Sequence, residues 1–118
     1  MTKIAYRQLG KNGLSVSAIS LGCMSLSGIY GAAEDAQSEA LIHHAIDIGI
    51  NHLDSSDMYG WGHNEEVVGR AIKGGRDKVV LASKFGQVRL TVRRRLWTGD
   101  PSTCSRLATQ VSRGSVSM

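Results

Sequence analysis

The chain has 118 residues and carries 14 Lys and Arg against 10 Asp and Glu, which gives a net charge of +4. This length allows one small domain with a modest core. It contains no apolar run of about 18 residues and no charged segment that leads into an apolar one. We therefore expect no membrane span and no secretion signal, and a cytoplasmic protein instead.

The first predicted element is a hairpin near the N-terminus. Residues 5–22, AYRQLGKNGLSVSAISLG, alternate apolar and polar side chains around Lys11-Asn12-Gly13. Asn-Gly is the strongest short hairpin signal. Residues 17–22, SAISLG, then indicate a buried strand, and a Gly-containing loop follows it.

Two amphipathic helices alternate with two further strands. Residues 35–49, DAQSEALIHHAIDIG, predict a helix that Gly49 ends. Its expected apolar stripe consists of Leu41, Ala45 and Ile48, with Ile42 and Ile46 beside it. The opposite, polar side of the helix consists of Glu39, His43 and Asp47. Residues 50–56, INHLDSS, form a short strand, and residues 64–75, NEEVVGRAIKGG, predict the second helix.

The third strand completes a regular alternation of strands and helices. Residues 78–84, KVVLASK, are continuous and β-branched, as expected of a strand that is buried on both faces. The strands follow one another at intervals of about 30 residues, a spacing that predicts parallel pairing through right-handed crossovers. The fold class is α/β, either an open sheet or a barrel.

The C-terminal segment has a different composition. Residues 1–89 hold nine Lys and Arg and nine Asp and Glu, whereas residues 90–118 hold five arginines and one aspartate. Beyond Gly86 the sequence has no clear period and is rich in Ser, Thr and Arg, so we predict no regular structure there. We divide the chain into an N-terminal part, 1–89, and a basic irregular tail, 90–118.

Polar residues gather where the predicted strands end. Asp54 ends the second strand, Tyr59 lies in the loop after it, and Lys84 ends the third. Functional groups of α/β proteins stand at this edge of the sheet. A cation beside Tyr59 stabilises its phenolate, and Asp54 keeps Lys84 charged and oriented, so the set predicts a general acid that protonates a carbonyl oxygen as hydride arrives.

Each of these residues taken alone more often has a structural role, so the prediction depends on their convergence. The four histidines are expected either on the surface or in structural roles with their hydrogen bonds satisfied. His63 is expected to order its loop. The two cysteines, Cys23 and Cys104, lack metal-ligand spacing and are expected to be reduced thiols. We predict no metal site.

Three motifs of the chain resemble one family. HLDSSDMYGWGHNEEVVGRAI (52–72) resembles the aldo-keto reductase signature, in which a strand-end Asp precedes an Asp-x-Tyr-Gly turn and a Glu-x-x-x-Gly helix. LASKFG (81–86) resembles the segment with the family's lysine, and RQLGKNGLSVSAISLGCMSLS (7–27) its N-terminal hairpin and first strand. The resemblance covers about residues 4–89, and the motifs agree in order and spacing.

The resemblance implies a fold and a reaction. The fold is the N-terminal portion of a TIM (β/α)8 barrel, a β-hairpin plus about three βα units; the barrel is incomplete because a whole one takes roughly 250 residues. The reaction is the NADP(H)-dependent interconversion of a small-molecule carbonyl compound and an alcohol. Asp54, Tyr59 and Lys84 match three members of the family's catalytic tetrad, with Tyr59 as proton donor. The cofactor-binding residues implied are Gly22, Cys23, Met24 and Asp54, near the nicotinamide ribose.

Other parts of the family's site have no counterpart in the sequence. The fourth tetrad member is a histidine at the end of the fourth strand, and no histidine follows His63. The later loops that hold the nicotinamide amide, the pyrophosphate and the adenosine phosphate are also missing. We therefore expect a truncated chain of 118 residues that does not bind NADP(H) and is inactive alone.

A shifted reading frame explains the tail best. In the shifted frame, each new codon consists of the last base of one original codon and the first two bases of the following codon. With a suitable choice of synonymous codons for residues 98–118, the shifted translation ends in Arg-Leu-Gly-Val-Asp. Aldo-keto reductases show this ending before their fourth strand. The first base of each shifted codon is a free choice, whereas the second and third bases are fixed by the tail.

Two alternatives belong to other classes. One is a genuine short protein whose Arg-rich tail binds nucleic acid or an acidic partner, supported by Arg93-Arg94-Arg95 with Trp97 nearby. No recognised nucleic-acid motif accompanies this cluster. The other is a structural or regulatory subunit that keeps the start of the fold without catalysis.

Overall fold

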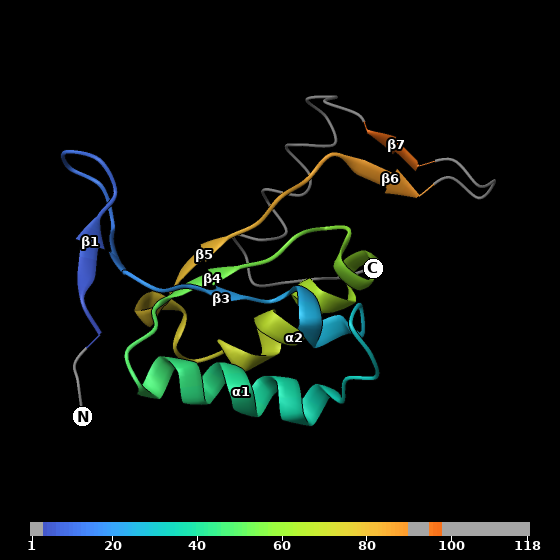
Figure 1. Cartoon of the computed structure of the whole chain (residues 1–118), viewed down its shortest axis with the longest axis horizontal. Coiled ribbons are helices and arrows are strands. Elements are labelled where there is room, and N and C mark those ends of the chain that lie inside the picture. The colour runs from blue at the N-terminus through green and yellow to red at the C-terminus, as the bar shows by residue number, and fades with distance from the viewer. Residues whose placement is uncertain (1–3, 90–94, 98–118) are drawn as a thin grey trace.

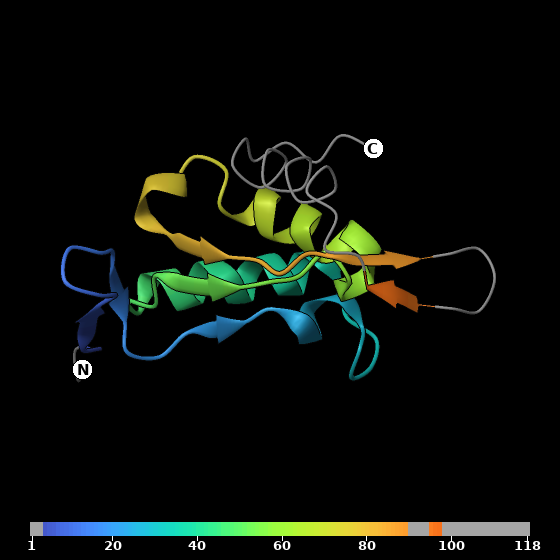
Figure 2. The ribbon, with the colours of Figure 1, turned by 90° about the horizontal axis from the view of Figure 1, so that it is seen from above.

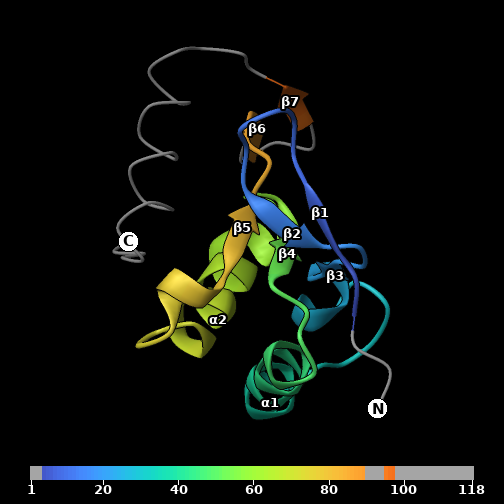
Figure 3. The ribbon, with the colours of Figure 1, turned by 90° about the vertical axis from the view of Figure 1, so that its left-hand side faces the viewer.

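The computed structural model describes residues 4–89 and 95–97. A three-stranded parallel sheet lies at its centre, both α-helices pack on one side of that sheet, and a small antiparallel pair of strands lies at each end (Figures 1 and 3). The strands are β1 (Tyr6–Gln8), β2 (Ser15–Ser17), β3 (Leu21–Gly22), β4 (His52–Asp54), β5 (Val80–Ala82), β6 (Gln87–Arg89) and β7 (Arg95–Trp97). The helices are α1 (Asp35–Asp47) and α2 (His63–Ala71), and the short 3₁₀ turns are η1 (Met24–Ser27), η2 (Tyr59–Gly62) and η3 (Arg76–Lys78).

The parallel sheet confirms the predicted alternation of strands and helices. Its order is β3-β4-β5, with Leu21 opposite Leu53 and Leu53 opposite Leu81. Two details of the prediction are wrong. The strand predicted over residues 17–22 shrinks to Leu21–Gly22, and Ile19 is 63% exposed. The strand expected to be buried on both faces, β5, is half-buried, because the helices cover one face only (Figure 3).

The core lies between the sheet and the two helices. Leu53 at the centre of β4 has no exposed surface, and it belongs to one cluster with Ile42 of α1 and Val68 of α2. The other buried members are Cys23, Leu26, Ala71, Ile72 and Val79. Burial of a large aliphatic side chain stabilises a fold by about 1.5 to 3 kcal/mol. These contacts fix the helices against the sheet and thereby fix the loops at the ends of its strands.

The predicted apolar face of α1 is confirmed for Ile42, Ala45 and Ile46 and is wrong for Leu41 and Ile48. The structure buries Ser38, Ile42 and Ala45, which are four and three residues apart and share one face. Leu41 of the expected stripe is 45% exposed instead. The expected polar side packs toward α2: Glu39 accepts a hydrogen bond from Arg70 Nε, and His43 Nε2 lies 2.8 Å from the Ala71 carbonyl oxygen. Apolar residues stand on two adjacent faces of this helix, so periodicity alone does not select between them.

The N-terminal hairpin is confirmed. β1 and β2 pair antiparallel, with Arg7 opposite Val16, and the Leu9 amide donates to the Leu14 carbonyl oxygen over 2.9 Å. The connection is tight at Gly13, where a Cβ atom would lie 1.6 Å from the Leu9 carbonyl oxygen. The hairpin lies at the end of the sheet where the parallel strands begin (Figures 1 and 2).

The prediction that no regular structure follows Gly86 is wrong for two segments. β6 and β7 pair antiparallel, with Val88 opposite Leu96, beyond the end of the sheet where the parallel strands finish (Figure 2). Gln87-Val88-Arg89 alternates polar and apolar residues, and Val and Trp favour strands. Residues 90–94 and 98–118, and with them Cys104 and most of the predicted tail, lie outside the described residues.

Candidate active site

The strand register brings the loops of the candidate site to one edge of the sheet. Gly22, Asp54 and Ala82 lie side by side at the ends of β3, β4 and β5. The residues just beyond them therefore meet at the same edge. The amide of Ser55 donates to the Ala82 carbonyl oxygen over 2.8 Å, and the amide of Cys23 donates to the Asp54 carbonyl oxygen over 2.8 Å.

The structure brings Asp54, Tyr59 and Lys84 together at this edge. Lys84 Nζ lies 2.6 Å from Asp54 Oδ1 and 5.2 Å from the centroid of the Tyr59 ring. The side chains of Lys84 and Asp54 are 51% and 44% exposed, so the pair is accessible to a ligand. A charged amine beside a phenol stabilises the phenolate that remains when the phenol gives up its proton.

The surroundings of Lys84 keep it protonated. Partial burial lowers the pKa of Lys84, but the hydrogen bond and the charge of Asp54, together with Tyr59, outweigh burial and raise this pKa above its ordinary value. The ammonium is consequently charged throughout the neutral range. The position of Asp54 at the end of the neighbouring strand produces this effect.

Ser56 and Asp57, between Asp54 and Tyr59, form hydrogen bonds to the backbone around Lys84. The sequence analysis assigned no role to either residue. The Asp57 amide donates to the Lys84 carbonyl oxygen over 2.9 Å, and Asp57 Oδ2 accepts a hydrogen bond of 3.0 Å from the Gly86 amide. The buried Ser56 hydroxyl lies 3.5 Å from the same Lys84 oxygen. Asp57 is the first residue of the Asp-x-Tyr-Gly turn, so its side-chain acceptor explains why an aspartate suits that turn.

A tight turn presents Tyr59 to this edge. The Tyr59 amide donates to the Ser56 carbonyl oxygen over 3.1 Å, and both residues that follow have positive φ, 60° at Gly60 and 54° at Trp61. A Cβ atom at position 60 would lie 3.0 Å from the Cβ atom of Ser27. Positive φ is uncommon for a bulky residue and marks local strain at Trp61, which often accompanies functional sites.

The residues expected on the cofactor side lie beside Asp54. Gly22 is its neighbour in the sheet, and a Cβ atom built on Gly22 would meet no atom of the described residues within 4 Å. This open space beside the exposed Asp54 and Lys84 side chains can admit part of a ligand. The Cys23 side chain is fully buried in the core, so the expected cofactor contact of this residue is left to its backbone and stays a prediction. Burial raises the pKa of the Cys23 thiol to about 11, and the thiol is free and neutral.

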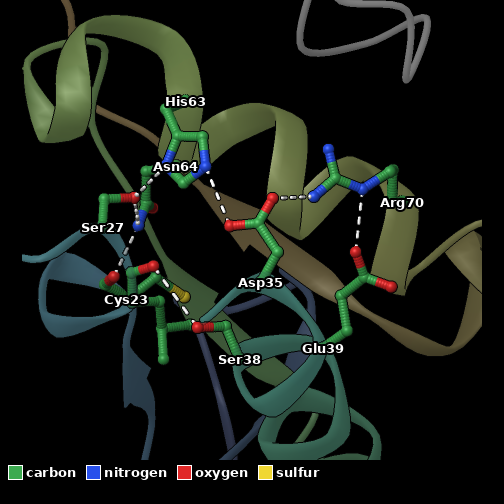
Figure 4. A network of polar contacts seen from close by, with 9 residues as sticks. Cys23, Ser27, Asp35, Ser38, Glu39, His63, Asn64 and Arg70 are labelled. Atoms are coloured by element: carbon green, nitrogen blue, oxygen red, sulfur yellow. Dashed lines mark hydrogen bonds and ion pairs between the residues drawn. The ribbon is translucent and has the colours of Figure 1, made fainter. Parts of the chain in front are cut away.

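A polar network lies behind the site and joins the loop after β3 to α2 (Figure 4). Its buried centre is Asn64, which sequence analysis missed because polar residues in a first helical turn are usually solvated. Its outer part agrees with the expectation for His63, whose Nε2 lies 2.9 Å from Asp35 Oδ1 and whose Nδ1 lies 3.2 Å from Ser27 Oγ. Arg70 continues it with an ion pair of 2.6 Å to Asp35.

The described residues contain no cluster of metal ligands and no helix that could cross a membrane. In residues 4–89 and 95–97, no three His, Cys, Asp or Glu side chains are grouped closely enough to hold a metal ion. Neither helix of this part of the chain has the length and apolar character that a membrane crossing requires.

Sequence comparison connects the chain to known proteins. The sequence profile of the aldo/keto reductase family matches residues 18–115. Aldo-keto reductase yakc of Schizosaccharomyces pombe, whose name specifies NADP(+), is 45% identical over 85 residues, which are 70% of this chain and 24% of that protein. The uncharacterized oxidoreductase YqkF of Bacillus subtilis is 41% identical over 96 residues, 81% of this chain and 29% of that protein. The chain thus spans less than a third of either relative.

Solved structures give the same result. Aldo-keto reductase AKR11C1 from Bacillus halodurans, in its holo form, superposes with a TM-score of 0.80 at 30% identity, over 94% of this chain and 36% of that chain. The glycerol dehydrogenase AKR11B4 from Gluconobacter oxydans gives a TM-score of 0.73 at 28% identity, over 97% and 36%. The family profile extends past residue 89, and the division of the chain at that residue stays a prediction.

Proposed function

Because the chain belongs to the aldo/keto reductase family, we propose that it supplies part of the active site of an NADP(H)-dependent enzyme that interconverts carbonyl compounds and alcohols. Its hairpin, parallel strands and helices are the N-terminal portion of the family's (β/α)8 barrel. One observation carries the proposal: Lys84 Nζ lies 2.6 Å from Asp54 and 5.2 Å from the centre of the Tyr59 ring.

The three side chains can supply the proton that carbonyl reduction requires. A nicotinamide cofactor, when bound, would supply the hydride for the carbonyl carbon. The Tyr59 hydroxyl donates its proton to the carbonyl oxygen, which completes the alcohol and leaves a phenolate. Lys84 stabilises that phenolate, and Asp54 keeps Lys84 charged and in place. The half-exposed Lys84 gives solvent access for the proton that restores Tyr59.

We assign the cofactor side to the loop after β3. Gly22 is the sheet partner of Asp54, the Cys23 amide donates to the Asp54 carbonyl oxygen, and Met24 follows in the same loop. The open space at Gly22 suits the ribose end of a nicotinamide nucleotide. The buried Cys23 side chain packs in the core, and only the backbone of Cys23 is assigned to the cofactor side. The substrate class is a small carbonyl compound.

We also propose that the 118 residues are inactive by themselves. The family's tetrad includes a histidine from the fourth strand, and no histidine follows His63 in this sequence. The chain corresponds to 24% of yakc and 29% of YqkF, so most of such a relative lies outside the matched part.

A chimaera tests the proposal. Residues 1–89 replace the matching segment of yakc, and oxidation of NADPH is followed with a reactive aldehyde. We expect turnover that falls by about 100-fold or more in Tyr59→Phe, the usual scale for removal of a general acid. Tyr6→Phe is the matched control, because Tyr6 lies in the hairpin and its hydroxyl donates to the Gly49 carbonyl oxygen. A folded, NADPH-binding chimaera whose turnover is indifferent to Tyr59→Phe would overturn the proposal.

A further inference from the structure

Asn64 is a fully buried amide behind the candidate site. It lies in the first turn of α2, it has no exposed surface, and in the described part of the chain its side chain forms hydrogen bonds to other segments (Figure 4). Its Nδ2 donates to the Cys23 carbonyl oxygen over 2.6 Å and to Ser27 Oγ over 2.9 Å. Its Oδ1 accepts a hydrogen bond of 2.6 Å from the Ser55 hydroxyl.

These partners belong to the two sides of the site. Ser55 directly follows Asp54, whereas Cys23 and Ser27 belong to the loop and turn after β3. Two hydrogen bonds hold the backbone of Cys23. Its amide donates to the Asp54 carbonyl oxygen, and its carbonyl oxygen accepts from Asn64 Nδ2. Asn64 consequently links the cofactor side to the strand end that bears Asp54.

A role in capping α2 does not account for Asn64. The cap residue is Gly62, with φ of 101°, and no side chain caps this helix. The exposed part of the network does not account for it either, because the side chains of His63, Asp35 and Arg70 are 41–46% exposed and such ion pairs contribute little. A buried amide is costly unless it is fully bonded, so an apolar residue would serve packing alone at least as well.

We propose that Asn64 is a positioning residue, which sets the separation between the loop at Gly22–Met24 and the group of Asp54, Tyr59 and Lys84. The inference rests on the proposed function, since it assigns these two sides to cofactor and acid. Loss of the amide donor would free the Cys23 carbonyl group and let the loop at Cys23 turn away from Asp54, while the rest of the core stays in place. Misplacement by about 1 Å can reduce turnover by about 100-fold.

The test compares Asn64→Asp with Asn51→Asp. Both changes keep the size and remove an amide donor. Asn51 is half-buried at the opposite end of β4, where its Oδ1 accepts from the Ser17 amide over 2.7 Å and its Nδ2 donates to the Ser15 carbonyl oxygen over 3.0 Å. Ser55→Ala is the milder second variant, because it removes one bond of Asn64 and introduces no charge.

The first readout uses the whole 118-residue chain with Cys104→Ser, so that Cys23 is the only thiol. We expect Asn64→Asp to speed modification of Cys23 by about tenfold or more relative to Asn51→Asp, at equal global stability in denaturant. Equal rates in the two variants would overturn the positioning role. This readout needs no catalysis, so it does not depend on the proposed function.

The second readout uses the chimaera. We expect Asn64→Asp, and to a smaller extent Ser55→Ala, to lower kcat by about 10- to 100-fold and raise KM for NADPH, with Asn51→Asp within about twofold of the parent. An active parent with unchanged kinetics in both site variants would refute positioning and leave the proposed function intact. An inactive parent chimaera together with faster thiol modification in Asn64→Asp would refute the proposed function and leave the positioning role of Asn64 intact.

Discussion

Asp54 and Lys84 are 30 positions apart in the sequence, yet their side chains meet at 2.6 Å. The parallel register explains this contact, because Asp54 lies opposite Ala82, the last residue of β5, and Lys84 follows two residues after Ala82. The hydrogen bond and charge of Asp54 then raise the pKa of Lys84 against the effect of burial. The pair is thus a direct product of the sheet's topology.

The first prediction concerns this pair. In the chimaera, Asp54→Asn removes the charge that raises the pKa of Lys84, so the alkaline limb of kcat/KM should move to lower pH and turnover should fall by about tenfold or more. The measurement is the pH profile of NADPH oxidation. Asp47→Asn is the control, because Asp47 is exposed at the end of α1. An unmoved alkaline limb would show that Asp54 does not act through Lys84.

The second prediction concerns Cys23 and alkaline pH. Burial raises its pKa from 9.0 to about 11, so the folded chain binds the proton more tightly than the unfolded chain. The resulting stability is fully present below pH 9.0 and is lost as pH rises through about 11. The loss should amount to about 3 kcal/mol of unfolding free energy, at about 1.4 kcal/mol for each tenfold change.

Denaturant unfolding between neutral and alkaline pH measures this loss, with Cys104→Ser as the parent. Cys23→Ala should be less stable at neutral pH, because a packed side chain is removed, but should lose less stability on going to alkaline pH. Parallel curves for the parent and Cys23→Ala would contradict the assignment of the alkaline loss to Cys23.

The order of elements could be predicted from the sequence, because each depends on local signals. Gly49, with φ of 98°, ends α1 as expected, and the apolar run of β5 marks a strand. The meeting of Asp54, Tyr59 and Lys84 follows from parallel strands. The exposure of Leu41 could not be predicted, because Leu41 and Ile42 are equally apolar and only tertiary packing selects Ile42 for the core.

The supporting residues of the site were harder to predict than the site itself. Asn64 and Ser55 are polar residues whose types suggest solvent exposure, and only the close approach of the loop after β3 buries them. The β6–β7 pair was missed because strands of three residues carry too few side chains for a reliable period. Sequence patterns thus predicted the sheet edge where Asp54, Tyr59 and Lys84 meet, whereas the contacts of Asn64 and Ser55 behind it depend on tertiary packing.

The third prediction concerns folding of the 118 residues by themselves. In the described part of the chain the parallel sheet has three strands, and β5 is half-buried although its sequence suits a buried strand. A half-covered apolar strand at the edge of the described sheet favours association. We expect concentration-dependent aggregation, or thermal unfolding of low cooperativity, by light scattering and circular dichroism. A sharp, reversible and monomeric transition would contradict this expectation.

The fourth prediction concerns the reading frame of the tail. Sequencing of the genomic locus beyond the codon for Met118 should reveal, in the shifted frame, a fourth strand that ends in a histidine. The basis is the change of composition near residue 89, where five arginines and one aspartate follow a balanced segment. Stop codons in every frame soon after residue 118 would favour a genuine short protein, for which binding of the Arg-rich tail to nucleic acid is the next experiment.

The last prediction concerns cofactor binding by residues 1–118. The described residues place Asp54, Tyr59 and Lys84 beside the loop of Gly22–Met24, which can contact only one end of a dinucleotide. By resemblance to the family, most contacts to the cofactor come from later loops that have no counterpart in these residues. Holding two reactants together can contribute about 7 to 11 kcal/mol to catalysis, so loss of the cofactor site should matter more than loss of one histidine.

We therefore expect no saturable change of NADPH fluorescence with micromolar chain, and no NADPH oxidation with reactive aldehydes. The chimaera, under identical conditions, should bind NADPH and oxidise it, which controls for a protein that is merely misfolded or an assay that is too weak. Reductase activity of the 118-residue chain that disappears in Tyr59→Phe would show that these residues suffice for catalysis. The proton-donor role of Tyr59 would then stand, whereas the dependence on further segments would be wrong.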